Sequence, residues 1–251
     1  MKVKEIKIDS YSIGGNSPII IAGPCSVESH ESILEIAKAV KEAGAHMLRG
    51  GIFKPRTNPH DFQGLGLEGL EFMLEAKRLY QLPIVTELMD EKHLSRFVDD
   101  VDVIQIGSRN MYNYSLLKAV GETQKPILLK RGFSATVKEW ILAAEHILKG
   151  GNENVIFCER GIRTFETYTR NTLDLTVVPI IQKETGLPII VDPSHGTGKR
   201  ELVEIMSKAA LACGTNGLLI ESHIMPDLSI SDKEQTIDID ALSRIVRSAK
   251  V

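Results

Sequence analysis

The chain has 251 residues, of which 43% are hydrophobic, and its 33 acidic and 30 basic residues give a formal net charge of −3. This charge argues against a general nucleic-acid binder, whose phosphate contacts require a basic face. No apolar run approaches the roughly 20 residues that span a bilayer, and the first ten residues, MKVKEIKIDS, lack the apolar core of a signal peptide, so we expect a cytoplasmic protein without a membrane role.

Eight short, apolar, β-branched runs recur along the chain, each bounded by Gly, Pro or polar residues. They lie at residues 19–22, 46–49, 83–86, 103–106, 126–130, 154–158, 188–191 and 217–220. Their continuous rather than alternating apolarity indicates strands that are covered on both faces, as in a parallel sheet. Residues 1–18 precede the first run and are predicted to form a short N-terminal hairpin outside that sheet.

Helix-like segments separate and follow these runs, and several of them end in Gly, which suits a helix C-terminus. They cover residues 31–44, 68–81, 90–100, 114–122, 136–151, 173–186, 199–214 and 238–250. Eight βα units with short connections are what a (β/α)8 TIM barrel requires. A doubly wound open sheet is the alternative, but it seldom uses eight such evenly repeated units. With no linker or shift in composition, we predict an α/β chain that forms one (β/α)8 domain over residues 1–251.

Polar and mostly ionisable residues follow each of the eight runs. The chemistry of a TIM barrel is carried by the loops after the C-terminal ends of its strands, so we expect these residues to meet at one mouth. In chain order they are Cys25, Arg49, Lys54, Arg56, Glu87, Arg109, Lys130, Arg131, Glu159, Arg160, Arg163, Asp192, His195, Glu221 and His223. A single cation of this kind is usually a solvated loop residue. Six or more cationic side chains that converge on one mouth of a protein with a negative net charge indicate a pocket for a small polyanion.

The same set of residues suggests a metal site. If the first, seventh and eighth strands are neighbours in a closed barrel, then Cys25, His195 and Glu221 can point at one spot, and Asp232 lies on the long loop that follows. One thiolate, one imidazole and two carboxylates suit Mn²⁺, Fe²⁺, Co²⁺ or Zn²⁺. The spacing of these four residues along the sequence suggests a metal site but does not establish one. Cys25 taken alone is more often a small buried hydrophobe, and His195 could simply cap the helix that begins near Lys199.

The chain resembles the family of 3-deoxy-D-arabino-heptulosonate 7-phosphate (DAHP) synthases, in the short microbial form that is related to KDO8P synthase. Nearly the whole chain carries the resemblance, through AGPCSVES, RGGIFKPRTNPHDFQGLG, QIGSRNM, LLKRG, CERGIRTFETYTRNTLDL, VDPSHGTGKR, GLLIESH and SISDKEQ. It implies a metal-dependent condensation of phosphoenolpyruvate (PEP) with D-erythrose 4-phosphate, which opens the shikimate pathway of aromatic amino acid biosynthesis. It also implies a homo-oligomer, a tetramer.

The resemblance assigns roles to individual residues. It implies Cys25, His195, Glu221 and Asp232 as metal ligands, and Arg49, Lys54, Arg109, Lys130 and Arg160 as the residues that hold PEP. The segment KPRT contacts erythrose 4-phosphate, with Arg56 and Thr57 on its phosphate. KDO8P synthases typically read K-A-N-R-S-S at this place, so KPRT separates the two activities. One departure from the family pattern is ESHIMPD after the eighth strand, where relatives often have EVHPNP.

The chemistry of this reaction fits the residues. PEP carries a carboxylate and a phosphate and the aldose carries another phosphate, so two clusters of cations are needed. A divalent metal can polarise the aldehyde oxygen, which makes Cys25 and His195 catalytic through the ion. We expect Lys54 to act as the general acid toward that oxygen, and Glu87 to position or deprotonate the attacking water.

Three other functions are compatible with parts of the sequence. A Schiff-base aldolase would use Lys130 as its nucleophile and would need no metal. KDO8P synthase would use arabinose 5-phosphate. A sugar-phosphate sensor would need the cations but not Cys25 together with His195. Because about 18 residues precede the first strand, fewer than the roughly 50 of a separate ligand-binding domain, we also expect no feedback control, unless an effector binds between subunits.

Overall fold

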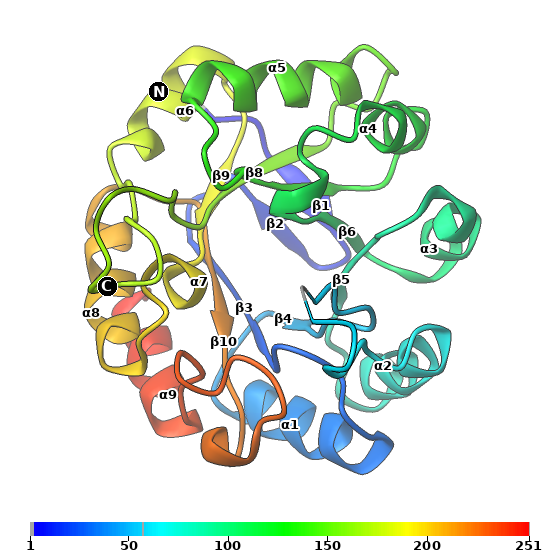
Figure 1. Cartoon of the computed structure of the whole chain (residues 1–251), viewed down its shortest axis with the longest axis vertical. Helices are drawn as coiled ribbons and strands as arrows, with labels where there is room; N and C mark the ends of the chain where they lie inside the picture. Colours follow the sequence, from blue (N-terminus) through cyan, green and yellow to red (C-terminus); the bar gives the residue numbers. More distant parts are fainter. Residues whose placement is uncertain (1–2, 57, 251) are drawn as a thin grey trace.

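Eight parallel strands close into a barrel in the computed structural model, which describes residues 3–56 and 58–250 (Figure 1). The strands are β3 (Ile19–Gly23), β4 (Met47–Arg49), β5 (Ile84–Glu87), β6 (Val103–Ile106), β7 (Ile127–Lys130), β8 (Val155–Glu159), β9 (Ile189–Val191) and β10 (Gly217–Glu221). They pair in chain order, and β10 pairs with β3 to close the barrel. The (β/α)8 barrel predicted from the sequence is confirmed, and each strand lies at a predicted run.

Helices surround the barrel as an outer ring (Figure 1). They are α1 (His30–Glu42), α2 (Leu67–Tyr80), α3 (Leu94–Asp100), α4 (Tyr114–Gly121), α5 (Val137–Leu148), α6 (Val177–Thr185), α8 (Arg200–Ala212) and α9 (Ile239–Ser248). A short helix α7 (Pro193–Thr197) and the 3-10 turns η1 (Glu91–His93), η2 (Ser108–Asn110) and η3 (Pro226–Leu228) lie in the loops. Within residues 3–56 and 58–250, no helix has both the length and the apolar character that crossing a membrane requires.

Three helical segments differ from the sequence prediction. The segment predicted as one helix over residues 90–100 begins with a 3-10 turn. The helix predicted from residue 173 begins only at Val177, because the preceding loop is held by Asp174, whose side chain bonds Arg131 and Thr176. The short helix α7 was not predicted, although Asp192 caps it by accepting from the backbone N–H of His195.

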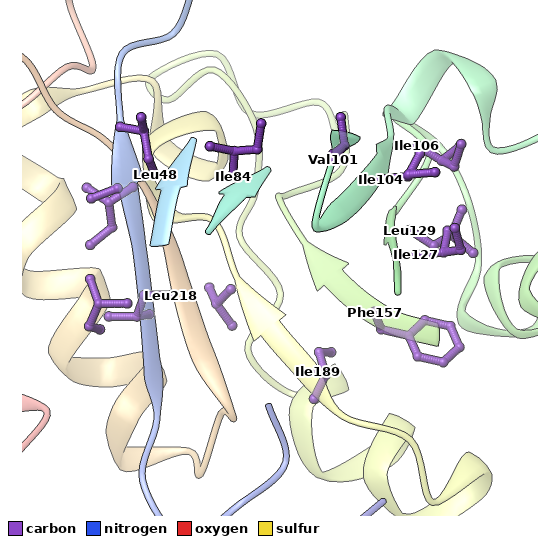
Figure 2. Close-up of a cluster of buried hydrophobic side chains, with 14 of the residues drawn as sticks. Leu48, Ile84, Val101, Ile104, Ile106, Ile127, Leu129, Phe157, Ile189 and Leu218 are labelled. Atoms are coloured by element: carbon purple, nitrogen blue, oxygen red, sulfur yellow. The ribbon is translucent and has the colours of Figure 1, made fainter. Parts of the chain in front are cut away.

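Side chains of the strands alternate between the barrel interior and the layer beneath the helices. Figure 2 shows the outer layer, with Leu48 and Leu129 among the side chains that pack against the helices. Met47 and Leu128 belong to the inner cluster instead. Since successive residues of a strand face opposite sides, Arg49 and Lys130 follow outward-facing leucines and therefore point inward. By the same alternation, polar residues that end other strands also point inward. Their position at the strand ends places them at the mouth.

The N-terminal hairpin closes the end of the barrel opposite the mouth. It consists of β1 (Ile6–Ile8) and β2 (Tyr11–Ile13), which pair antiparallel, as predicted. Ile6, Ile8 and Ile13 are buried in the inner cluster together with residues such as Ile19 and Val103 that begin the barrel strands. A backbone hydrogen bond of 2.8 Å from Lys4 to Gly186 holds the chain beside α6. The hairpin is therefore part of the core of the barrel.

We predict that Ile13→Ala lowers the free energy of unfolding by about 2–5 kcal/mol, because it leaves a cavity in the sealed end of the barrel. Ile13 is 0% exposed. Urea unfolding followed by circular dichroism measures the change, and Lys7→Ala, at an exposed position of the same hairpin, is the control. Equal stability of the two variants would contradict the packing role of the hairpin.

Candidate active site

The mouth of the barrel holds a pocket of about 430 Å³ that gathers most of the residues predicted for the site. Its lining includes Lys54, Arg56, Glu87, Arg109, Lys130, Arg160, His195 and Asp232. Cys25 and Arg49 line a smaller recess that shares Lys54, Glu87, Lys130 and His195 with this pocket. Glu221 is fully buried and bonds Arg49, while Thr57 lies outside the described residues. The described site residues thus lie together, and their individual roles stay predictions.

The four predicted metal ligands form one compact donor cluster. Their ligand atoms all lie within 4.8 Å of one another. Cys25 Sγ is 3.1 Å from Asp232 Oδ2, and His195 Nε2 is 3.4 Å from Glu221 Oε1. The chain reaches this position through Gly23, whose φ of +150° leaves space where a Cβ would lie 2.2 Å from the backbone of the next strand. One sulfur, one nitrogen and two carboxylate oxygens form a mixed donor set of the kind that binds Zn²⁺ and divalent first-row transition metals.

The surroundings fix the protonation states in this donor cluster. Burial lowers the pKa of His195 to about 4, although Asp192 and Glu221 oppose this shift, so the imidazole is neutral at pH 7. Its Nδ1 donates to Asp192 Oδ2 at 2.7 Å, which leaves the lone pair of Nε2 facing the cluster. Burial raises the pKa of the Cys25 thiol. The pKa values of Glu221 and Asp232 lie below their usual range because nearby cations outweigh the effect of burial.

Three cations beside the donor cluster are paired. Lys130 Nζ is 2.7 Å from Asp192 Oδ2, and Arg49 Nη1 is 2.8 Å from Glu221 Oε1. Lys54 Nζ lies 2.5 Å from the cysteine sulfur of the cluster and 3.1 Å from its aspartate. Burial would lower the pKa of Lys54, but the groups of the cluster raise it by more, so the ammonium keeps its proton. This half of the pocket is therefore close to charge balance.

Three arginines, of which Arg109 and Arg160 line the pocket, surround one aromatic ring. The guanidinium carbons of Arg109, Arg160 and Arg163 lie 5.4, 5.0 and 4.6 Å from the centre of the Phe133 ring. Among the described residues, no carboxylate lies within 4 Å of any of these three guanidinium groups. The ring holds the like charges together through cation–π contacts, so this half of the pocket attracts an anion.

Glu87 lies between these two halves. Its carboxylate accepts a hydrogen bond from Gln105 at 3.2 Å, and burial raises its pKa. Gly107 makes room for it, because a Cβ at that position would lie 2.1 Å from Glu87 Oε1. A carboxyl group with a raised pKa beside a cationic pocket is suited to exchange a proton with water or substrate.

The structure adds residues for which the sequence predicted no role. Phe133 and Arg170 line the pocket, and Gln235 and Asp192 bond the predicted ligands Glu221 and His195. Phe133 and Gln235 follow predicted site residues by three positions, within the motifs LLKRG-F and SISDKEQ. Arg170 lies in the long loop between β8 and α6, within the motif CERGIRTFETYTRNTLDL, but the sequence analysis assigned it no role. Asp192 was recognised as a strand-end residue, but its partners could be seen only in three dimensions.

Comparisons with known proteins agree with this geometry. The model of the DAHP synthetase I family matches residues 3–250. Phospho-2-dehydro-3-deoxyheptonate aldolase of Thermotoga maritima is 48% identical over 245 residues, which are 98% of this chain and 72% of that protein. A 2-dehydro-3-deoxyphosphooctonate aldolase of Nitrobacter hamburgensis is 32% identical over 263 residues, with 96% of this chain and 90% of that protein covered.

Solved structures give the same result. The crystal structure of the Thermotoga maritima aldolase, also named DAHP synthase, matches with a TM-score of 0.95 at 47% identity, over 99% of this chain and 73% of the other. A truncated form of 3-deoxy-D-arabino-heptulosonate 7-phosphate synthase from the same organism matches with a TM-score of 0.92 at 44% identity, over 99% and 91% of the two chains. The resemblance seen in the motifs is confirmed, and the chain belongs to the DAHP synthetase I family.

Proposed function

We propose that the protein is a DAHP synthase, which condenses PEP with D-erythrose 4-phosphate to give DAHP and phosphate in the first step of the shikimate pathway. One observation carries this proposal: the donor cluster of Cys25, His195, Glu221 and Asp232 lies at the same pocket as Arg109 and Arg160, which have no carboxylate partner in the described part of the chain. Joining an anionic enol phosphate to an aldehyde requires an anion-binding site next to a group that polarises the aldehyde carbonyl. The arginines of the pocket supply the first, and an ion held by the donor cluster would supply the second.

The cations divide between the two substrates. We assign PEP to Arg49, Lys54, Arg109, Lys130 and Arg160, because guanidinium groups bind carboxylates and phosphates through paired hydrogen bonds. Arg56 lies on the outer side of the pocket, where its Nε donates to Asp61 at 3.3 Å. We assign the phosphate of erythrose 4-phosphate to Arg56 and Thr57. With this division, we expect the reacting carbons of the two substrates to lie near the donor cluster.

Lys54 and Glu87 are the proposed proton-transfer residues. A divalent ion on the donor cluster, Mn²⁺, Fe²⁺, Co²⁺ or Zn²⁺, would polarise the aldehyde. C3 of PEP then bonds to the aldehyde carbon, and Lys54, already in contact with the cluster, donates a proton to the aldehyde oxygen, which becomes a hydroxyl. Water adds at C2 of PEP with Glu87 as its base or orienting group, and phosphate leaves as its bond to C2 breaks.

The resemblance to the family also supports a homo-oligomer, which we propose to be a tetramer, and a cytoplasmic location. Small-molecule substrates follow from membership of the family.

Two enzymes compete with this proposal. A Schiff-base aldolase needs a lysine amine that is free to attack a carbonyl, whereas Lys130 Nζ is buried and paired with Asp192 Oδ2 at 2.7 Å. KDO8P synthase is the second. The relatives named 2-dehydro-3-deoxyphosphooctonate aldolase are 27–32% identical, against 48% for the heptonate aldolase.

We predict that EDTA abolishes turnover and that Mn²⁺ or a similar ion restores it. Cys25→Ala should lose the bound metal and the activity while keeping the fold, because it removes the sulfur donor of the cluster. Metal content and circular dichroism measure the two properties, and Cys213→Ala, at an exposed cysteine, is the control. Normal turnover of Cys25→Ala in the absence of stoichiometric metal would refute the site.

We predict a higher kcat/KM with erythrose 4-phosphate than with arabinose 5-phosphate. The reason is the segment KPRT after β4, which the family resemblance assigns to erythrose 4-phosphate. A pocket wall that separates such homologous sugars contributes about 1–3 kcal/mol, so weak activity with the pentose is compatible. Initial rates with each sugar at fixed PEP give the ratio. A preference for the pentose would assign the protein to the KDO8P synthases instead, and trapping of a lysine adduct by borohydride would indicate the Schiff-base enzyme.

We predict that Glu87→Gln lowers kcat by about 10²–10⁴-fold and leaves the KM for PEP within a few-fold, because the amide cannot accept a proton from water. Steady-state kinetics of phosphate release measure both constants. Glu91→Gln, at an exposed carboxylate in the next loop segment, should behave as wild type. An unchanged kcat in Glu87→Gln would remove this residue from the proton-transfer step.

A further inference from the structure

The two carboxylate oxygens of Asp232 face different groups. Oδ2 faces the donor cluster, at 3.1 Å from both Cys25 Sγ and Lys54 Nζ. Oδ1 faces away from the cluster and accepts a hydrogen bond from Arg170 Nη1 at 3.2 Å. The backbone of Asp232 has a φ of +50°, a left-handed conformation that Asp tolerates better than most residues. Asp232 therefore presents one oxygen to the cluster because Arg170 holds the other.

Glu221 is arranged in the same way. Its Oε1 lies 3.4 Å from His195 Nε2 and 2.8 Å from Arg49 Nη1, on the side of the cluster. Its Oε2 accepts from the side-chain amide of Gln235 at 2.5 Å. The amide oxygen of Gln235 in turn accepts from Arg170 Nη1 at 2.9 Å. This orientation of the amide is the one that the contacts allow, since guanidinium can only donate and carboxylate can only accept.

Arg170 is itself held by the segment that carries His195. Its backbone N–H donates to the carbonyl of Thr197 at 2.9 Å, at the end of α7. Its Cβ lies against Gly198, where an added Cβ would be 2.4 Å away. The loop between β8 and α6, to which Arg170 belongs, supplies none of the four donor atoms. Arg170 thus connects this loop directly to the segments that carry His195 and Asp232, and through Gln235 to Glu221.

We propose that Arg170 is a positioning residue that orients both carboxylate ligands, Asp232 directly and Glu221 through Gln235. The inference rests on the proposed metal site and deepens it. Hydrogen bonds to the outer atoms of metal ligands hold the ligands in place, and their loss typically weakens metal binding by about 10–100-fold. Without the guanidinium, the side chains of Asp232 and Glu221 can rotate, and the ion meets a less ordered set of donors.

The direction of the change in metal affinity distinguishes a positioning role of Arg170 from a purely electrostatic one. Arg170 places a positive charge beside a site for a cation, so its removal should tighten metal binding if charge alone matters. If Arg170 positions the carboxylates, its removal should weaken metal binding. Arg163 is the matched control, because it is an exposed arginine of the same loop that contacts Phe133 and none of the four donors.

The test measures the dissociation constant of Mn²⁺ for the substrate-free protein by calorimetry, with circular dichroism to establish the fold. We expect Arg170→Gln and Gln235→Leu each to weaken binding by about 10–100-fold, and Arg170→Lys, which keeps the charge but not the planar fork, to fall between them and wild type. Because Gln235 carries only the branch to Glu221, whereas Arg170 also holds Asp232 directly, the double variant should bind more weakly than either single variant, but by less than the product of the two losses. Arg163→Gln should bind as wild type does.

Three outcomes would overturn the inference. Unchanged or tighter binding in Arg170→Gln excludes positioning, and fully multiplicative losses in the double variant exclude a relay through Gln235. Equal weakening in Arg163→Gln would show a general effect of the loop. In each case tight binding by wild type leaves the proposed function intact, whereas a wild-type protein that binds no divalent ion would refute the proposed function and this inference together.

Discussion

The pairing of β10 with β3 is the constraint on which the site depends. Five consecutive residue pairs join these strands, from Gly217 with Ile19 to Glu221 with Gly23. This register brings the end of the last strand beside the end of the first, so that Glu221 and the cysteine loop after Gly23 meet although they lie far apart in the sequence. The metal-competent cluster exists because the sheet is closed, and an open sheet of the same strands would separate its members.

The alternation of side chains along each strand supplies the second constraint. A shift of one residue in the register would turn Arg49, Lys130 and Glu221 from the interior into the apolar layer beneath the helices. The charged groups are tolerated in the interior because they are paired, as in the contact of Arg49 with Glu221, and breaking such a buried pair is strongly destabilising. Folding in the correct register and assembling the site are thus the same event.

The sequence predicted the features that depend on chain order. Runs of apolar residues located all eight strands, and the rule that barrel strands end at one mouth brought Cys25, His195 and Glu221 to the same place. The hairpin was predicted for the residues that precede the first run. These predictions succeed because periodicity and strand order are properties of the backbone, and each is set by local residue types.

Other features depend on contacts that chain order does not encode. Arg170 reaches the carboxylates from a long loop, and a side chain of its length can point in many directions until its neighbours are known. The helix start at Val177 is set by Asp174, which bonds a buried arginine of another loop instead of opening a helix. The neutral state of His195 follows from burial, which outweighs the opposing effect of Asp192, and the depth of burial cannot be read from the motif that contains both residues.

The hairpin at the far end of the barrel also constrains the order of events during turnover. In the described part of the chain, its isoleucines cover the end opposite the mouth, so reactants and products pass through the same side. The cations assigned to PEP include the buried Arg49 and Lys130, whereas Arg56 lies nearer the rim. If PEP binds the deeper cations, as we propose, the aldose would cover it. On this assignment PEP enters the pocket before the sugar phosphate.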